Sequence, residues 1–439
     1  MDIWPRILAH YGIICNLCYD QGMPKKWKKL LGALGPGVIT GAADDDPSGI
    51  ATYSQTGAQF GYGQLWTALY MLPFQTAVQE AAARIGAVTG KGIVAVARGL
   101  WGKQVVWFLV ALVLIANTIN IGADIGAMAA ALQLVTPFSF IQLTLSTTAL
   151  ILVLEIFTSY RVYARILKWL ALTLFAYPLT VFFIKAPWDK LLAFTVLPHF
   201  ELTPAFFFII TGVLGTTISP YMFFWQAGEE VEEEKMRHLK VSKPFISRLR
   251  FDNFVGMFFS EIGTWAMIVV SATVLFSHGI TDIRTAADAA KALEPLVTSF
   301  PNSGYLAKLL FSVGIVGLGL LSIPVLSGSA AYATAEAFKM HEGLNLKLRQ
   351  AHGFYGVITI ATVVGLLINF VGIDPMKALV YTAVINGVVA VPLIFFIAKI
   401  AENKKIMGSY TSGLLSKLLV WATFFGMGAS ALAMIFMLK

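Results

Sequence analysis

Charged residues are scarce in this chain. Only 13% of its 439 residues are Asp, Glu, Lys or Arg, whereas 57% are hydrophobic. In soluble domains about a quarter of the residues are charged. A chain with so few charges cannot be a single water-soluble domain. At about 20 residues for each membrane-spanning helix, the length allows roughly ten to twelve spans. The composition therefore predicts an all-α polytopic membrane protein.

Cysteine is nearly absent, and the motifs of intramembrane enzymes are missing. Cys15 and Cys18 form one CxxC pair, whereas a structural zinc site takes four ligands, so we expect unpaired thiols. The chain has neither the HExxH pattern of zinc proteases nor the GxSxG turn of serine hydrolases. Neither an enzyme nor a bound cofactor is therefore expected.

Long apolar runs, separated by Gly, Pro or charged clusters, predict eleven membrane spans. If the N-terminus is cytoplasmic, the predicted inner segments carry 24 of the 32 basic residues. The positive-inside rule then places the N-terminus in the cytoplasm and the C-terminus outside. It also explains the basic charge, so no nucleic-acid partner is expected. The predicted spans are 33–58, 63–88, 104–134, 138–159, 163–185, 203–228, 253–277, 306–334, 353–372, 376–399 and 412–437.

The first and sixth predicted spans contain helix-breaking residues in their middles. The first reads Asp46-Pro47-Ser48-Gly49, and the sixth reads TTISPY over residues 216–221. Proline removes a backbone donor and clashes with the preceding turn. Two ordinary proline kinks would be the simpler interpretation. Breaks at corresponding positions instead favour a five-plus-five inverted repeat, with the substrate between the two breaks. We expect an N-terminal segment and three further units: 1–32, 33–185, 203–399 and 412–437.

Three consecutive aspartates, Asp44 to Asp46, stand at the first break. A carboxylate inside a membrane is costly and marks a functional cavity. Successive helical residues point about 100° apart, so all three cannot face one site. We expect Asp46 to be the primary ligand, and Asp45 and Asp44 to line its approach or to pair with neighbours. A negative site of this kind predicts a cation.

Three stretches resemble the Nramp family of divalent-metal transporters. They read GPGVITGAADDDPSGIATYSQTGAQFG, QEAAARIGAVTG and GTTISPYMFFWQ, in the family's order along almost the whole chain. The resemblance implies eleven spans in a LeuT-type fold with broken helices one and six. It also implies a multi-pass protein of the cell (inner) membrane that transports divalent metal ions, and we expect a monomer.

The two broken-helix motifs depart from the family pattern. Gly49 stands where the family has a coordinating asparagine, Ser219 replaces its methionine, and Tyr221 replaces its histidine. Without a thioether the site keeps oxygen donors, which suit Mg²⁺. This pattern resembles the Nramp-related magnesium transporters, a branch regarded as carrying Mg²⁺ and Mn²⁺ without evident proton coupling. We therefore expect import of partly hydrated Mg²⁺, with Mn²⁺ also passing.

The third span bears on proton coupling. The family carries an acidic pair there, and Asn120 and Ala123 occupy the matching positions, although Asp124 is one residue away. Tyr221 does not titrate near neutral pH. Proton coupling is therefore not expected. An ordinary proton-coupled Mn²⁺ or Fe²⁺ importer is the alternative.

Further candidates surround the two breaks. The resemblance suggests the Thr216 carbonyl as a ligand, and the Thr217 and Tyr221 hydroxyls could hold water around the ion. Asn386 and Glu261 are expected to face the same cavity or to be satisfied within the protein. His199 and His278 are expected to be structural. The predicted metal-site residues are Asp46, Gly49, Thr216, Thr217, Ser219 and Tyr221, and those lining the cavity are Asp45, Asn386 and Glu261.

Overall fold

A computed structural model describes residues 36–158, 175–237 and 241–438, and within these ranges the regular structure is entirely helical. Seven of the described helical segments are long and apolar enough to cross a membrane. The described helices match the predicted spans except the fifth, most of which lies outside the described residues. The N-terminal segment 1–32, with Cys15 and Cys18, also lies outside them.

The first and sixth spans are each made of two helices in sequence. Two residues separate α4 (Pro36–Asp44) from α5 (Pro47–Phe60). Two residues likewise separate α13 (Pro204–Thr217) from α14 (Pro220–Arg237). The unbroken helices before α13 are α6 (Trp66–Thr89), α7 (Ile93–Trp101), α8 (Lys103–Leu132), α9 (Phe140–Phe157), α11 (Ala176–Val181) and α12 (Trp188–Val196).

The remaining described helices follow α14 in the second half of the chain. Its long helices are α15 (Lys243–Val274), α18 (Ser303–Phe338), α19 (His352–Ile368) and α20 (Pro375–Ala401), followed by α22 (Leu414–Met437). Short helices α16 (Ala286–Ala290), α17 (Glu294–Val297) and α21 (Lys404–Met407) lie in the connections.

Several helices begin at a residue whose side chain caps the first turn. Thr203, Ser242 and Asp374 each accept a backbone N–H of the helix that follows, and proline occupies the first or second position of that helix. This combination satisfies an otherwise unpaired donor and fixes φ at the start. The cap at Ser242 makes α15 begin ten residues before the predicted span at 253.

Small residues let the broken helices approach their neighbours closely. A Cβ on Gly41 of α4 would lie 2.3 Å from the carbonyl oxygen of Gly256 in α15. A Cβ on Gly215 of α13 would lie 2.2 Å from the backbone nitrogen of Gly387 in α20. Such contacts are how membrane helices associate without a hydrophobic driving force between them. They hold α4 and α5 against α15, and α13 against α20.

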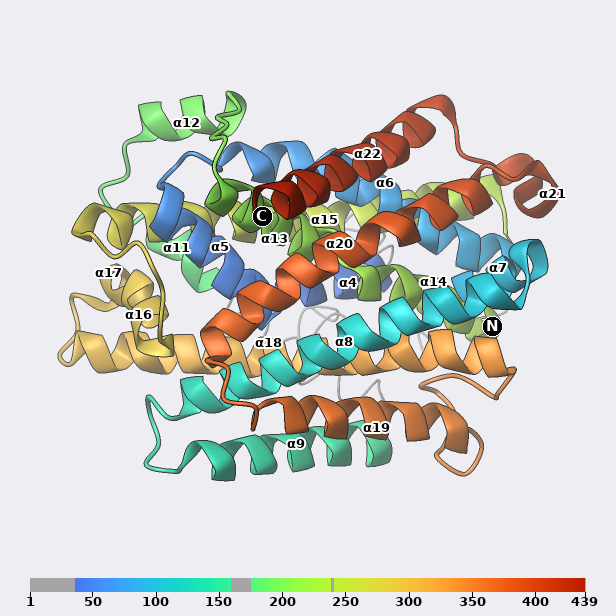
Figure 1. Ribbon diagram of the computed structural model, residues 1–439, viewed down its shortest axis with the longest axis horizontal. Coiled ribbons are helices and arrows are strands. Elements are labelled where there is room, and N and C mark those ends of the chain that lie inside the picture. Colours follow the sequence, from blue (N-terminus) through green and yellow to red (C-terminus); the bar gives the residue numbers. More distant parts are fainter. Residues whose placement is uncertain (1–35, 159–174, 238–240, 439) are drawn as a thin grey trace, which may run out of the picture.

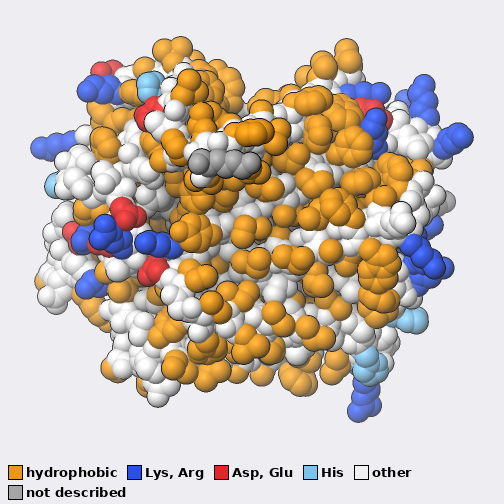
Figure 2. Space-filling view, viewed as in Figure 1, with side chains coloured by type: hydrophobic (Ala, Val, Ile, Leu, Met, Phe, Trp, Pro, Cys, Tyr) orange, Lys and Arg blue, Asp and Glu red, His pale blue; other side chains and the backbone are white. Residues whose placement is uncertain are grey.

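The other long helices surround these pairs. α8 packs against α18, α19 and α20, and α9 lies beside α19 along one side of the molecule (Figure 1). Figure 2 shows hydrophobic side chains across the middle of the visible face, with Lys and Arg at its two opposite ends. This distribution is that of a multi-pass membrane protein whose helices run between the two charged ends.

Candidate metal site between the broken helices

The first break is organised by Asp46. Its backbone is extended, with φ −65° and ψ 174°, and its Oδ1 accepts the backbone N–H of Gly49 at 2.8 Å. Asp46 is thus the N-cap of α5, with Pro47 as the first helical residue. The Ser48 hydroxyl also donates to Oδ1, at 2.6 Å. The two-residue break therefore fixes the carboxylate at the start of α5.

The second break is closed by side chains that bond the last carbonyls of α13. The Ser219 hydroxyl donates to the carbonyl oxygens of Gly215 at 2.8 Å and Thr216 at 2.7 Å. The Gln75 amide, from α6, donates to the Thr217 carbonyl oxygen at 2.9 Å. These contacts satisfy carbonyl groups that have no partner within the helix. They explain how the break is tolerated at membrane depth.

The two breaks meet each other. The Ser48 and Thr216 hydroxyl oxygens are 3.4 Å apart, and the Tyr53 and Thr217 hydroxyls are 2.8 Å apart. A Cβ on Gly49 would lie 3.3 Å from Oγ1 of Thr216. The start of α5 therefore faces the end of α13, and both are buried.

A chain of amides connects Asp46 to two further helices. Asn120, from α8, donates to Oδ2 of Asp46 at 3.0 Å, and the Asn386 side-chain amide, from α20, donates to Oδ1 of Asn120 at 3.0 Å. The Asn386 oxygen itself has no hydrogen-bond partner. Asp124 lies next in this network, 3.4 Å from the Asn120 amide, and accepts the Ser322 hydroxyl at 2.9 Å.

The other two aspartates of the triplet differ in their surroundings. Asp44 accepts hydrogen bonds from Gln75 and, at 2.5 Å, from the Ser260 hydroxyl of α15. Both carboxylate oxygens of Asp45, and both of Glu261, are buried without a hydrogen-bond partner. Acidic groups therefore continue from Asp46 towards α15.

No basic side chain balances these acids within the described ranges. None of the ion pairs there includes Asp44, Asp45, Asp46, Asp124 or Glu261. All five are at most 4% exposed. A buried carboxylate without a counter-charge is unfavourable, so this region is suited to a positively charged substrate.

The predicted site residues are therefore brought together only in part. Asp46, Gly49 and Thr216 lie around one point, and Asn386 reaches it through Asn120. The Thr217 hydroxyl is engaged by Tyr53, and the Tyr221 hydroxyl donates to the Ala43 carbonyl oxygen at 3.1 Å. Glu261 lies on the α15 side of the triplet.

Sequence reasoning missed several residues of this region. Ser48, Tyr53, Gln75 and Ser260 contact the breaks, yet each is an ordinary polar residue in an apolar segment. The available signal was their polarity within a membrane span. His199, whose side chain is 54% exposed, lies in the connection before α13, and exposed His278 bonds the last turn of α15.

Comparisons with known proteins cover almost the whole chain. The family model described as natural resistance-associated macrophage protein-like (Nramp) matches residues 37–437. The divalent metal cation transporter MntH of Caldanaerobacter subterraneus subsp. tengcongensis is 27% identical over 395 residues, which cover 89% of this chain and 90% of the relative. It is named as a transporter and not as an enzyme.

Solved structures share the fold. A manganese transporter of Eremococcus coleocola, crystallised with an aromatic bis-isothiourea compound, superposes with a TM-score of 0.72 at 16% identity, covering 94% of this chain and 87% of its own. MhsT in complex with L-phenylalanine, a LeuT-type structure, superposes with a TM-score of 0.56 at 12% identity. The superposition covers 92% of this chain and 97% of MhsT. Because the family model spans nearly the whole described chain and the fold is that of solved relatives, the chain belongs to the Nramp family.

Proposed function

We propose that the protein imports divalent metal cations, Mg²⁺ in the first place and Mn²⁺ as well, in partly hydrated form and by alternating access. The single observation that carries the proposal is the unbalanced set of buried carboxyl groups where α5 meets α13. Relatives named as divalent metal cation transporters support the substrate class. The choice of Mg²⁺ rests on this chain's own donor groups.

The donor groups at the meeting point are oxygens. They are the Asp46 carboxylate, the Ser48 and Thr216 hydroxyls and the carbonyls of the α13 end. Hard cations such as Mg²⁺ prefer oxygen, whereas a thioether favours softer ions. Ser219 contributes no sulfur and keeps its hydroxyl on backbone carbonyls. This chemistry favours Mg²⁺ over the softer metals.

The existing hydrogen bonds favour an ion that keeps part of its water. Oδ1 of Asp46 already accepts two hydrogen bonds, and Oδ2 of Asp46 and the Thr216 carbonyl oxygen each accept one. Mg²⁺ gives up its water reluctantly and is usually held through one or two carboxylates. Water molecules of the ion could donate to the unpaired side-chain oxygen of Asn386. We propose Asp46, Gly49, Thr216, Thr217, Ser219 and Tyr221 as the site, with Asp45, Asn386 and Glu261 along the cavity.

Transport without proton coupling is supported by the neutral groups around Asp46. Its partner on α8 is Asn120, an amide that does not titrate, and the Tyr221 hydroxyl is engaged with a backbone carbonyl. Proton relays in membranes use Asp, Glu or His. A divalent cation that moves inward across 100 mV gains about 4.6 kcal/mol, twice the value for one charge. The membrane potential therefore suffices as the driving force.

One observation favours the alternative, a proton-coupled Mn²⁺ or Fe²⁺ importer. Asp124 is fully buried and connected to Asp46 through Asn120. A carboxyl group at this position could exchange a proton with the site. Cadmium separates the two proposals, because a soft-ligand importer is blocked strongly by Cd²⁺ and an all-oxygen magnesium site only weakly.

The arrangement in the membrane is part of the proposal. We propose that residues 33–185 and 203–399 are the two inverted repeats and that 412–437 is an added span. The N-terminus then lies in the cytoplasm and the C-terminus outside, as the basic residues predict. A protein of this kind works as a monomer in the cell (inner) membrane.

The test uses the full chain in liposomes that contain a Mg²⁺-sensitive dye and a pH-sensitive dye. On addition of external Mg²⁺ with an inside-negative potential, we expect a rise in internal Mg²⁺ without acidification. Mn²⁺ should enter too. Acidification in step with metal entry would support the proton-coupled alternative. Absence of any Mg²⁺ entry, with Mn²⁺ uptake intact, would overturn the magnesium assignment.

A further inference from the structure

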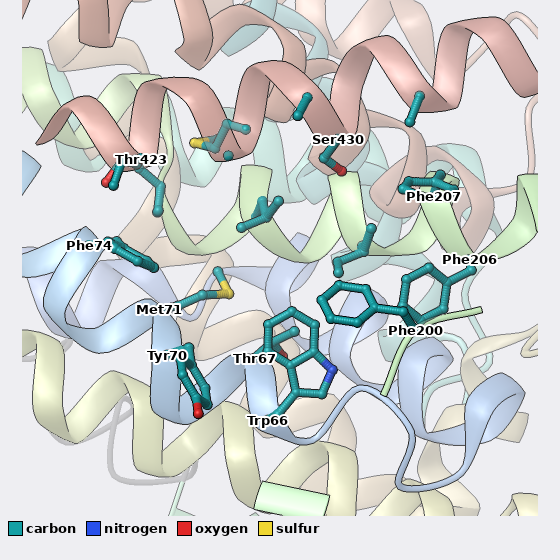
Figure 3. Close-up of a pocket in the computed structure, with 18 residues that line it drawn as sticks. Trp66, Thr67, Tyr70, Met71, Phe74, Phe200, Phe206, Phe207, Thr423 and Ser430 are labelled. Carbon is teal, nitrogen blue, oxygen red and sulfur yellow. The ribbon is translucent and has the colours of Figure 1, made fainter. Parts of the chain in front are cut away.

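A groove of about 410 Å³ lies between α6, α13 and α22, apart from the candidate metal site (Figure 3). Figure 3 shows aromatic and methionine side chains from α6, α13 and the segment before α13 lining it. Most of the lining atoms belong to apolar side chains, among them Met71, Phe74, Phe206, Ile210 and Leu214.

The groove has an exposed rim and a buried floor. Tyr70 and Phe200 at the rim are 39% and 59% exposed, whereas Met71 and Ile218 in the floor are 2% and 1% exposed. The rim continues on α22 into the outward-facing Phe425, which is 65% exposed. That apolar surface is the part of the molecule that faces lipid. The groove is therefore continuous with the lipid interface.

The polar side chains of the groove are few, and all are engaged within the protein. Each of them has a hydrogen-bond partner inside the protein, so a polar solute or a hydrated ion would lose its water without replacement. The partners are the His199 carbonyl for Trp66, the Gln64 carbonyl for Thr67, the Val196 carbonyl for Tyr70, the Leu419 carbonyl for Thr423 and the Thr211 hydroxyl for Ser430. The occupant must be apolar.

The length of the groove matches one leaflet of a bilayer. Its lining along α13 runs from Phe206 to Ile218, a rise of about 18 Å at the usual helical spacing. Half of a hydrocarbon core is about 15 Å thick. One end of the groove lies at the start of α13, and the other end lies at the break of the sixth span. A single extended acyl chain fits this distance.

We propose that the groove binds one acyl chain of a membrane phospholipid. The chain enters from the surrounding leaflet at Gly426, where a Cβ would meet open space. It ends at Ile218, the C-cap of α13, next to the residues that close the second break. The groove and the cation site share no donor groups, although Ile218 lies between Thr217 and Ser219 in the chain.

The experiment uses the full chain in phosphatidylcholine vesicles that contain a small fraction of phosphatidylcholine with a mid-chain diazirine. After irradiation and digestion, mass spectrometry locates the adducts. We expect adducts on the floor residues Met71, Ile218 and Met427, which are at most 2% exposed. Bulk lipid should label the exposed Leu432 as an internal reference. Adducts confined to exposed residues would overturn the proposal.

Filled-groove variants supply the control. Gly426→Phe places a ring in the open space of the groove, and we expect the floor adducts to fall at least tenfold while the label on Leu432 persists. Ala429→Phe, one turn further along the exposed rim, tests the same point if the first variant folds poorly. Leu432→Phe, on the lipid-facing surface, should leave the floor adducts unchanged.

Two further results would contradict a bound phospholipid. Floor adducts that persist in both filled variants would mean that the label arrives by another route. Floor labelling by a diazirine fatty acid, without any from the phosphatidylcholine, would assign the groove to a free fatty acid. None of these results depends on whether the protein transports Mg²⁺.

Discussion

At the scale of single residues, the candidate site depends on how few side-chain atoms surround Asp46. Gly49 brings its backbone N–H to the carboxylate and leaves the space beside Tyr53 and Thr216 without a side chain. An added Cβ there would lie 3.2 Å from Cε2 of Tyr53 and 3.3 Å from Oγ1 of Thr216. These neighbours would have to shift by a few tenths of an ångström. The absence of a side chain at position 49 therefore sets the space at the meeting point.

Restoring the family's ligands should change ion preference. In Gly49→Asn combined with Ser219→Met, an amide and a thioether enter the site, and soft ions gain a donor that Mg²⁺ does not use. We expect uptake of Mn²⁺ and Cd²⁺ relative to Mg²⁺ to rise about tenfold, equivalent to about 1.4 kcal/mol. Uptake by proteoliposomes measures this ratio.

The matched control for that double variant is Gly49→Ala with Ser219→Ala. It changes the same positions without adding a metal ligand. This variant should keep the wild-type ranking of ions, even if the rate falls. An identical ranking in the two double variants would mean that ion selectivity is determined elsewhere.

At the scale of helices, the second break depends on side-chain donors from outside α13. In Gln75→Leu, Asp44 and the Thr217 carbonyl each lose one hydrogen bond. Leaving buried acceptors unpaired costs about 1–3 kcal/mol for each group. We expect a lower melting temperature and slower Mg²⁺ uptake, measured on the same preparation.

Gln79→Leu is the control for this change, since Gln79 lies one turn away on α6 and donates to the Met222 carbonyl within α14. It should lower stability less than Gln75→Leu does, because it leaves one acceptor unpaired and not two, while uptake per folded molecule stays near wild type. If both variants lose uptake equally, the loss comes from packing of α6 and not from the break.

Much of the helical architecture could be predicted from the sequence, because apolar runs and their breaking residues are local signals. The breaks directly before Pro47 and Pro220 lie where the helix-breaking residues predicted them. The early start of α15 at Lys243 was missed, because its first turns are polar and are specified by a cap at Ser242. The short helices α7 and α12 fell within predicted connections.

The tertiary contacts of the site could not be predicted to the same extent. The role of Asp46 at the break follows from its place before Pro47. The contact of Asn120 with Asp46, however, joins residues 74 positions apart. Likewise, the sequence predicted an oxygen donor to the site at Ser219 and a hydroxyl that could hold water at Tyr221, whereas both hydroxyls donate to backbone carbonyls. Such pairings depend on the packing of helices and not on a local pattern.

At the scale of the whole molecule, a buried ion pair connects three segments at the end that carries α7 and α21. Glu80 accepts from Arg84 at 2.8 Å and from Arg250 of α15 at 2.9 Å. Arg84 also donates to the Tyr410 carbonyl and to the Ser412 hydroxyl at 2.8 Å. The network holds α6, α15 and the connection before α22 together at this end.

Breaking this network should be strongly destabilising. Glu80→Gln leaves the fully buried Arg84 without its counter-charge, a change that typically costs about 3–5 kcal/mol. We expect a large drop in the melting temperature of the detergent-solubilised protein. Asp282→Asn removes the exposed pair with Arg284 and should have an effect of less than about 1 kcal/mol. Equal melting temperatures for the two variants would contradict the proposed role of Glu80.

The connection between α18 and α19 should make stability depend on pH. Burial raises the pKa of Glu342 from 4.5 to about 7, although the Lys235 ammonium acts to lower it. The folded protein therefore binds more protons than the unfolded chain between these values, and stability falls as pH rises from about 5 to 8. We expect a loss of about 1–3 kcal/mol over this range. In Glu342→Gln, the melting temperature should change less between pH 5 and pH 8 than it does in the wild type. The same dependence of melting temperature on pH in both proteins would contradict this assignment.

The most direct measurement is Mg²⁺ uptake by proteoliposomes containing Asp46→Asn, compared with wild type and with Glu155→Gln. Both variants neutralise a buried acid of similar size, but Glu155 lies on α9 and bonds only Ser327 among the described contacts. We predict that Asp46→Asn loses at least nine-tenths of the uptake, roughly 1.4 kcal/mol or more, while Glu155→Gln retains most of it. Uptake by Asp46→Asn at the wild-type rate would contradict a cation site at the meeting of the two broken helices.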